Sequence, residues 1–118
     1  MAEITYTQSF PIKGNSDFML VTWNGMTVAD TGLPFILSQY ADRSVQSSGV
    51  FGSGGSVLVE GTNDSSVYAP LSDPQGNTLS MTTPKIETIS EIVVAIRPRV
   101  SAGDGTTSIN VSMLVRKN

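Results

Sequence analysis

Acidic side chains are the main candidates for catalysis in this sequence, because it contains no histidine and no cysteine. The chain therefore lacks the usual general base near neutral pH and the thiolate nucleophile. Two carboxyl groups can still hydrolyse a glycosidic bond when they face each other across a cleft. The candidate pairs are Asp64 with Asp73 and Glu60 with Glu87, and their spacing singles out neither. We predict no catalytic residues and a protein that acts by binding, not as an enzyme.

Loop oxygens are the next candidates, because Asn63, Asp64 and Asp104 carry the hard ligands that calcium prefers. The spacing of an EF-hand loop is absent. Asp104 stands between two glycines, where an aspartate commonly bonds the backbone of its own turn. We therefore predict ordinary turn residues here, with no metal site and no cofactor.

The aromatic residues Trp23, Tyr6, Tyr40 and Tyr68 offer a third chemistry, since a sugar ring can stack on such side chains. Aromatic residues within strands are far more often part of a core or an interface. We predict the second role for these four and no carbohydrate platform.

Arg97 and Arg99 are two residues apart, so they share one side of any strand that contains them. We predict that this side faces solvent. There the two guanidinium groups can pair with acidic groups of a partner, or they can form a solubilising strand edge. Both interpretations stay open.

The composition predicts one folded domain over residues 1–118. Apolar residues make up 39% of the chain, which is too many for a disordered protein, and charged residues make up 14%. The net charge is −3, so the electrostatic attraction that drives nucleic-acid binding is weak. The first residues lack the pattern of a secretory signal, and the apolar runs are too short for a membrane span. We expect a soluble protein made in the cytoplasm, without a nucleic-acid or membrane partner.

Alternation of apolar and polar residues indicates that strands must position these side chains. It is clearest at Ile109, Val111, Met113 and Val115, which share one side of a strand near the end of the chain. A second strand is predicted just before it, and its inward side carries Ile92, Val94, Ile96, Pro98 and Val100. Because proline has no N–H for a strand ladder, we place this strand at a sheet edge or at a bulge.

Turn sequences divide the chain into about eight strands, as expected of a sandwich or barrel. The run 102–106 predicts a hairpin between the last two strands, and Asp73-Pro74-Gln75-Gly76-Asn77 predicts a tight turn. Residues 87–92 form one helical turn at most, and residues 49–55 form a flexible connection. The other strands are expected at residues 3–8, 18–23, 35–46, 56–61, 67–71 and 78–82. We predict an all-β antiparallel sandwich.

Several short segments of the sequence, spread over residues 30–116, resemble those of small tailed-phage and prophage proteins that accompany capsid proteins. These are head decoration, or cement, proteins. These segments lie in predicted turns and strands, and none of them is a catalytic motif. They are Tyr40-Ala41-Asp42-Arg43-Ser44-Val45-Gln46, Gly54-Gly55-Ser56-Val57, Glu60-Gly61, Asn63-Asp64, the turn 73–77, Arg97-Pro98-Arg99 and Gly103-Asp104-Gly105-Thr106-Thr107.

The resemblance implies a jelly-roll-like β-sandwich on the outer surface of a virion. Its partners would be the major capsid protein and further copies of itself, with a homotrimer favoured and a homodimer possible. Apolar residues on the outward side of strands, such as Val93 and Leu114, would then contact other subunits, beside Arg97 and Arg99. Residues 1–30 lie outside the resemblance and are open to interpretation as an arm.

The alternative function is a carbohydrate- or receptor-binding sandwich of a phage tail or fibre. Loop aromatics around a shallow groove would favour this alternative. Buried aromatics and a flat apolar patch would favour the decoration protein. A cleft with two carboxyl groups about 5 to 10 Å apart would instead indicate a glycosidase.

Overall fold

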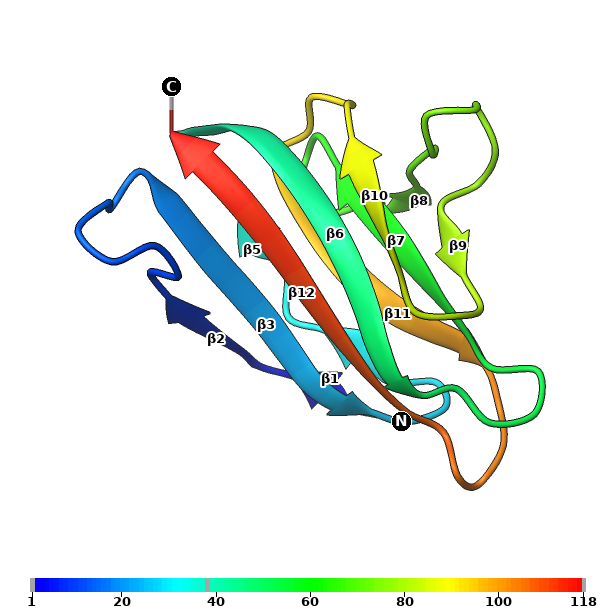
Figure 1. Ribbon diagram of the computed structural model, residues 1–118. Helices are drawn as coiled ribbons and strands as arrows, with labels where there is room; N and C mark the ends of the chain where they lie inside the picture. Colours follow the sequence, from blue (N-terminus) through cyan, green and yellow to red (C-terminus); the bar gives the residue numbers. More distant parts are fainter. Residues whose placement is uncertain (1, 38, 118) are drawn as a thin grey trace.

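The computed structural model describes residues 2–37 and 39–117, and every regular element in them is a β-strand. The strands form two sheets that pack face to face around a core (Figure 1). The predicted all-β sandwich is therefore confirmed. In chain order the strands are β1 (Glu3–Ile4), β2 (Tyr6–Ser9), β3 (Phe18–Met26), β4 (Thr31–Gly32), β5 (Phe35–Ile36), β6 (Tyr40–Val50), β7 (Ser56–Thr62), β8 (Ala69–Pro70), β9 (Ser80–Met81), β10 (Lys85–Ile89), β11 (Ala95–Ala102) and β12 (Ser108–Lys117).

The described chain thus contains twelve strands where we predicted about eight. The strand predicted at residues 3–8 is divided into β1 and β2, and the strand predicted at residues 35–46 is divided into β5 and β6. Strand β4 was not predicted. The helical turn predicted at residues 87–92 is wrong, because β10 occupies residues 85–89 and pairs with β6 along its whole length.

Strand β12 is the centre of the five-stranded sheet, whose order is β10-β6-β12-β3-β2 with antiparallel neighbours throughout. Its core-facing residues Ile109, Val111, Met113 and Val115 are at most 1% exposed. This confirms the alternation predicted for the strand. Strands β3 and β6 both depend on β12 for their place in the sheet.

The seven-stranded sheet runs β1-β4-β11-β7-β8, with β5 also paired to β11 and β9 also paired to β7. Its long strands β7 and β11 are antiparallel, and β1 is parallel to β4. Residues 3–9 therefore pair within their own chain, through β1 in this sheet and β2 in the other.

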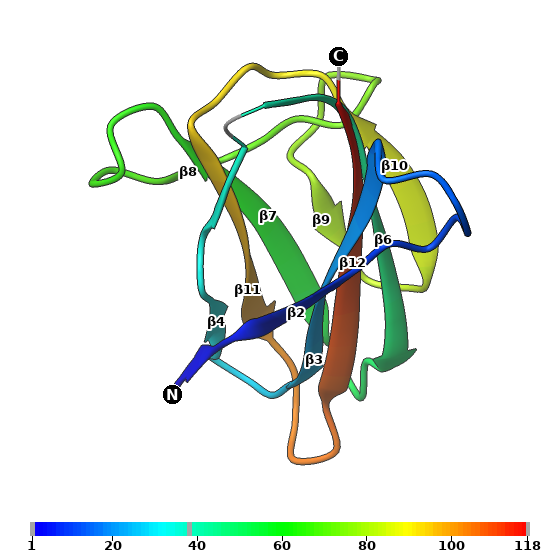
Figure 2. The same ribbon diagram turned by 90° about the vertical axis from the view of Figure 1, so that its left-hand side faces the viewer.

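Strands β11 and β12 lie in different sheets, so the hairpin predicted between them is wrong. Their connection crosses from one layer to the other (Figure 2). Glycine and aspartate permit a tight reversal in both situations, so turn chemistry alone does not distinguish a hairpin from a crossing. The two strands present their apolar sides to one core from opposite layers.

Pro98 lies inside the sheet, although we predicted an edge or a bulge. It is opposite Val59 of β7, whose N–H donates to the carbonyl of Leu79 and so points away from β11. The nitrogen of Pro98 therefore also points away from β7. It faces the gap between β4 and β5, where no ladder bond is needed.

Strand β11 begins at Ala95, so Ile92 and Val94 lie outside the strand that we predicted to contain them. Ile96, Pro98 and Val100 are buried as predicted, whereas Ile92 is 90% exposed and Val94 is also exposed.

The predicted turn at residues 73–77 is confirmed. The Asp73 carboxylate accepts hydrogen bonds from the backbone N–H groups of Gln75 and Asn77, and Gly76 supplies the positive φ. The flexible connection is shorter than predicted, because Gly49 and Val50 belong to β6.

Candidate interaction surfaces

The four residues that we predicted to bind partners lie on three different surfaces. Arg97 and Arg99 are on the outer face of the seven-stranded sheet, and Leu114 is on the outer face of the five-stranded sheet. Val93 precedes β11, in the connection between β10 and β11. The structure therefore brings together only the two arginines.

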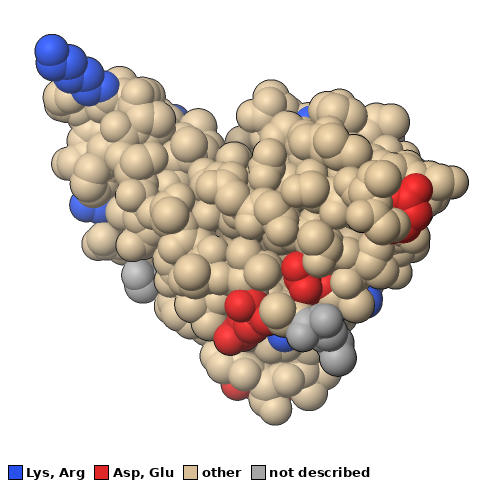
Figure 3. Space-filling model, turned by 90° about the horizontal axis from the view of Figure 1, so that it is seen from below, with Lys and Arg blue, Asp and Glu red and all other residues tan. Residues whose placement is uncertain are grey.

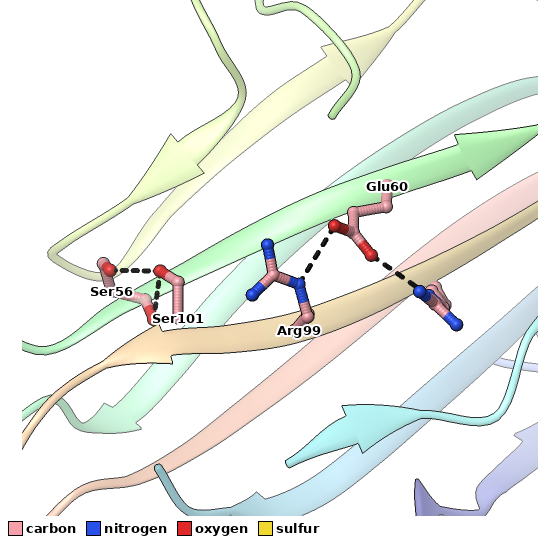
Figure 4. Close-up of polar contacts among 5 residues, drawn as sticks. Ser56, Glu60, Arg99 and Ser101 are labelled. Carbon is pink, nitrogen blue, oxygen red and sulfur yellow. Dashed lines mark hydrogen bonds and ion pairs between the residues drawn. The ribbon is translucent and has the colours of Figure 1, made fainter. Parts of the chain in front are cut away.

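Arg97 and Arg99 share one buried carboxylate. Their Nε atoms each donate to an oxygen of Glu60, both at 3.0 Å, and Glu60 is only 5% exposed (Figure 4). The guanidinium group of Arg97 also lies 3.7 Å from the centre of the Tyr68 ring, a cation–π contact. These contacts hold both arginine side chains in place on the sheet.

The acidic group that pairs with both arginines is Glu60 of the same chain, and the strand-edge interpretation is wrong because β11 lies inside its sheet. Pairing with a partner's acidic groups stays a prediction. Glu60 carries one negative charge and the two arginines carry two positive charges, so the cluster has a net positive charge within a protein of net charge −3. Among the described residues, none accepts a hydrogen bond from the terminal nitrogens of Arg97 or Arg99. Those nitrogens can receive a carboxylate from outside.

The outer face of the five-stranded sheet combines polar with apolar side chains, and Ser44, Gln46 and Ser112 lie there beside Leu114. Two grooves cross it, of about 630 and 280 Å³, and Ser44 and Leu114 line both of them. Ile86, which lines the smaller groove, is 62% exposed, and Ile12 beside it is also exposed. Leu114 thus lines both grooves on an outer face of mixed polarity.

An apolar surface lies at the upper end of the sandwich as drawn in Figure 1, where β10 connects to β11. Val93 separates two hollows of about 430 and 330 Å³ and lines both. The exposed apolar residues around them are Ile36, Val67, Ile92 and Val94. We call this surface the upper end.

The two surfaces meet at Arg43, which together with Ala41 lines both the 630 Å³ groove and the 430 Å³ hollow. Arg43 is buried and donates to the backbone carbonyls of Ala41 and Glu91. Burial lowers its pKa, against the opposing effect of the neighbouring Glu91 and Asp42 carboxylates. Its Nε and the Oε1 of Glu91 are buried and have no hydrogen-bond partner among the described residues.

The opposite, lower end consists of connections that cross between the sheets and are fastened by two aspartates. Asp104 accepts hydrogen bonds from the backbone N–H groups of Ser53 and Thr106, both at 2.9 Å, and from the Thr106 hydroxyl at 2.6 Å. These bonds lower the pKa of Asp104 to about 2, the Thr106 hydroxyl having the largest effect. Gly52 is required beside it, because φ is +72° and a Cβ would lie 2.3 Å from Asp104 Oδ1.

Asp30 fastens the same end from inside. Its carboxylate accepts bonds from the N–H and hydroxyl of Thr27, both at 2.9 Å, and from the N–H of Ala2 at 3.0 Å. Burial acts to raise the pKa of Asp30, but these hydrogen bonds outweigh it and the pKa is lowered. Figure 3 views this end and shows acidic atoms at several places on an otherwise largely uncharged surface.

The aromatic residues considered as a sugar platform are largely internal. Trp23 is 1% exposed and donates its Nε1–H to the carbonyl of Leu33. Tyr6 packs edge-on against Trp23, and Tyr6 and Tyr40 both pack against the core. Tyr68 is half-buried beneath Arg97. Trp23, Tyr6 and Tyr40 belong to the core, as predicted for aromatics in strands, whereas Tyr68 precedes β8 and packs against Arg97.

The acidic candidates have local roles. Asp64 accepts bonds from its own loop, at the N–H groups of Ser66 and Val67, and these bonds lower its pKa. Glu60 and Glu87 belong to different sheets and pair with different cations. In residues 2–37 and 39–117, no three His, Cys, Asp or Glu side chains group closely enough to hold a metal ion. No helix in those residues is long and apolar enough to cross a membrane.

No protein-family model matches the sequence, and no curated protein matches it. Among solved structures, the SPBc2 prophage-derived protein YomS is similar, with a TM-score of 0.62 and 11% sequence identity over 83% of this chain and 93% of that chain. The two proteins share a fold. A glycoside hydrolase matches with a TM-score of 0.38 and 11% identity, over 89% of this chain and 21% of that chain, and this weak overlap carries no argument.

Proposed function

We propose that this protein is a structural protein of a phage particle. In this proposal it is a decoration, or cement, protein that binds the outer surface of the head and stabilises contacts between major capsid subunits. The binding face is the outer face of the five-stranded sheet, centred on Leu114. The protein would be located on the capsid surface of the virion.

The observation that carries this proposal is the exposed apolar groove on the outer side of that sheet. An antiparallel sheet with one face in water normally presents polar side chains there. Here Ile12, Ile86 and Leu114 line a groove on the solvent side, beside the polar residues Ser44, Gln46 and Ser112. A partner that covers them would remove apolar surface from water, which is favourable by about 25 cal/mol for each Å² before the costs of binding.

Two further observations support the proposal. YomS, whose fold is similar, is a prophage-derived protein. The buried position of Trp23 and the core packing of Tyr6 and Tyr40 disfavour a sugar-stacking platform, and with it the carbohydrate-binding alternative. A face without a deep pocket is sufficient for a cement protein, because many copies on one lattice add their modest contacts.

The experiment is to mix the purified protein with phage heads that lack it and to follow co-sedimentation and the temperature at which the heads rupture. We expect saturable binding in a fixed ratio and a higher rupture temperature. Ile86→Asp places a charge in the apolar groove and should weaken binding at least about fivefold. Gln75→Asp adds the same charge in the exposed β8–β9 turn and should bind like the original protein.

Failure of the protein to bind heads would contradict the proposal. Binding to a glycan array under the same conditions would then favour the receptor-binding alternative. Equal weakening by Ile86→Asp and Gln75→Asp would also count against the proposed face, since it would indicate a general effect of charge.

A further inference from the structure

Asn24 and Gly25 form a bulge near the end of β3, at the one place in this sequence where glycine follows asparagine. The register between β3 and β12 shifts there, so that these two residues lie opposite the single residue Asn110. An extra residue on one of two paired strands is the defining feature of a β-bulge. Gly25 has a φ of +66°, a left-handed conformation that glycine adopts readily.

An asparagine that precedes glycine can react with its own backbone. The nitrogen of Gly25, after losing its proton, would attack Cγ of Asn24, forming a C–N bond and releasing the side-chain nitrogen as ammonia. The cyclic succinimide then takes up one water molecule, which breaks either of its ring C–N bonds and leaves aspartate or isoaspartate. Water is the only co-reactant. Glycine offers no side chain to obstruct the attack, and asparagine is among the thermolabile residues of proteins.

Solvent reaches the bulge, because Asn24 and Gly25 are both exposed. Among the described residues, no atom beyond the immediate chain neighbours lies within 4 Å of the position that a Cβ would take at Gly25. The structure therefore leaves this segment open, and crowding by neighbouring side chains does not prevent the reaction.

A hydrogen bond restrains the nucleophile instead. The N–H of Gly25 donates to Oδ1 of Asn110 at 2.9 Å, across 85 residues of sequence. Asn110 belongs to β12, the central strand of the five-stranded sheet, so its side chain starts from a well-supported backbone. A nitrogen that keeps its proton is a poor nucleophile. Loss of the proton would place negative charge against the Asn110 oxygen, and the bond therefore disfavours the step that begins the reaction.

We propose that Asn24 is a site of spontaneous deamidation and that Asn110 is a positioning residue that slows the reaction by holding the N–H of Gly25. Either product carries a carboxylate where Asn24 is neutral, and isoaspartate also inserts a methylene group into the main chain of β3. This inference goes beyond the proposed function and does not depend on it.

The test is to incubate the folded full chain in mildly alkaline buffer and to follow Asn24 by peptide mapping with mass spectrometry. We expect slow conversion in the original protein. Asn110→Ala should react roughly threefold to tenfold faster, because it removes the acceptor of one hydrogen bond. Asn110→Asp is the conservative variant. It retains an acceptor for the Gly25 N–H, so it should stay as slow as the original protein.

The matched control is Ser112→Ala. Ser112 also connects β12 to β3, because its Oγ lies 3.4 Å from Oγ of Thr22, at a register pair outside the bulge. This variant should convert Asn24 at the original rate. Each variant is incubated well below the midpoint of its own thermal unfolding. The original protein in guanidinium chloride supplies the rate of the unprotected chain, which should exceed the native rate.

Equal rates of Asn24 conversion in the native and denatured protein would overturn the proposal. So would an Asn110→Ala variant that reacts no faster than the original, or an Asn110→Asp variant that reacts as fast as Asn110→Ala. Equal acceleration by Ser112→Ala would also overturn it, because general loosening of the two strands would then explain the effect. These measurements involve no phage heads, so their outcome is separate from that of the head-binding experiment.

Discussion

The two ends of the sandwich differ in how the connections between the sheets are held. Both ends contain connections between the sheets. At the lower end, Asp30 and Asp104 each accept three hydrogen bonds that hold these connections. At the upper end, the connection between β10 and β11 leaves Ile92 and Val94 in water. Side-chain hydrogen bonds hold the connections of the lower end, whereas the connection between β10 and β11 leaves its apolar side chains exposed.

The polar groups of the two ends also differ in how fully their hydrogen bonds are satisfied. At the lower end, the carboxylates of Asp30 and Asp104 accept several hydrogen bonds each. At the upper end, Arg43 Nε and Glu91 Oε1 are buried without a hydrogen-bond partner in the part of the chain that the structure describes. Unpaired buried atoms of this kind lower stability, and native structures contain few of them. The comparison teaches that aspartate hydrogen bonds fasten the connections of the lower end, whereas the upper end combines exposed apolar side chains with buried polar atoms that lack a partner among the described residues.

Removing the carboxylate of Asp30 should have the largest effect. Asp30→Ala leaves the N–H groups of Thr27 and Ala2 without their acceptor, and we expect a loss of about 2 to 3 kcal/mol in the free energy of unfolding. Urea denaturation measures it. Asp17→Ala is the control, because Asp17 is exposed. Equal losses in both variants would show that the lower end is not fastened by Asp30.

Lowering the pH should loosen the lower end through Asp104. Its folded-state pKa of about 2 is below the ordinary value of 3.8, so its ionised form stabilises the fold above that ordinary value. This contribution is lost as the pH falls from about 4 towards 2. Asp104→Asn should therefore flatten the dependence of the melting temperature on pH in this window. An unchanged slope would contradict the role given to the carboxylate.

The smallest effect on folding is expected at the upper end. Ile92→Asp should change the free energy of unfolding by less than about 0.5 kcal/mol at concentrations where the protein is monomeric, because the side chain is exposed. The midpoint of urea denaturation measures this. A loss comparable to that of Asp30→Ala would mean that Ile92 packs within its own chain, and the contrast between the ends would fail.

The sequence predicted the parts of the fold that local periodicity determines. The alternation around Val111 identified the central strand and its buried side, and the composition of residues 73–77 identified their turn. Which strands become neighbours is decided by packing over long distances. The pairing of β11 with β7 and of β12 with β3 and β6 could not be inferred from the turn between β11 and β12.

The outward position of the candidate interaction residues was predictable to a similar extent. Strand parity placed Arg97, Arg99 and Leu114 on outward faces, but it did not reveal that Glu60 joins the two arginines from the neighbouring strand. The exposure of Ile92 was missed because the alternation of β11 seemed to continue through residues 92–94. The strand begins only at Ala95, and periodicity carries no information on where pairing starts.

The central position of β12 has a consequence for the order in which the molecule forms. Val115 pairs with Met19, nearly the whole length of the chain away, and the same strand separates β3 from β6. Proteins dominated by such distant pairings fold slowly, because a long loop must close before its contacts form. A nascent chain that has not yet released residues 108–117 from the ribosome has two halves of a sheet with nothing between them. Its exposed strand edges would make that stage the one most in need of protection from aggregation.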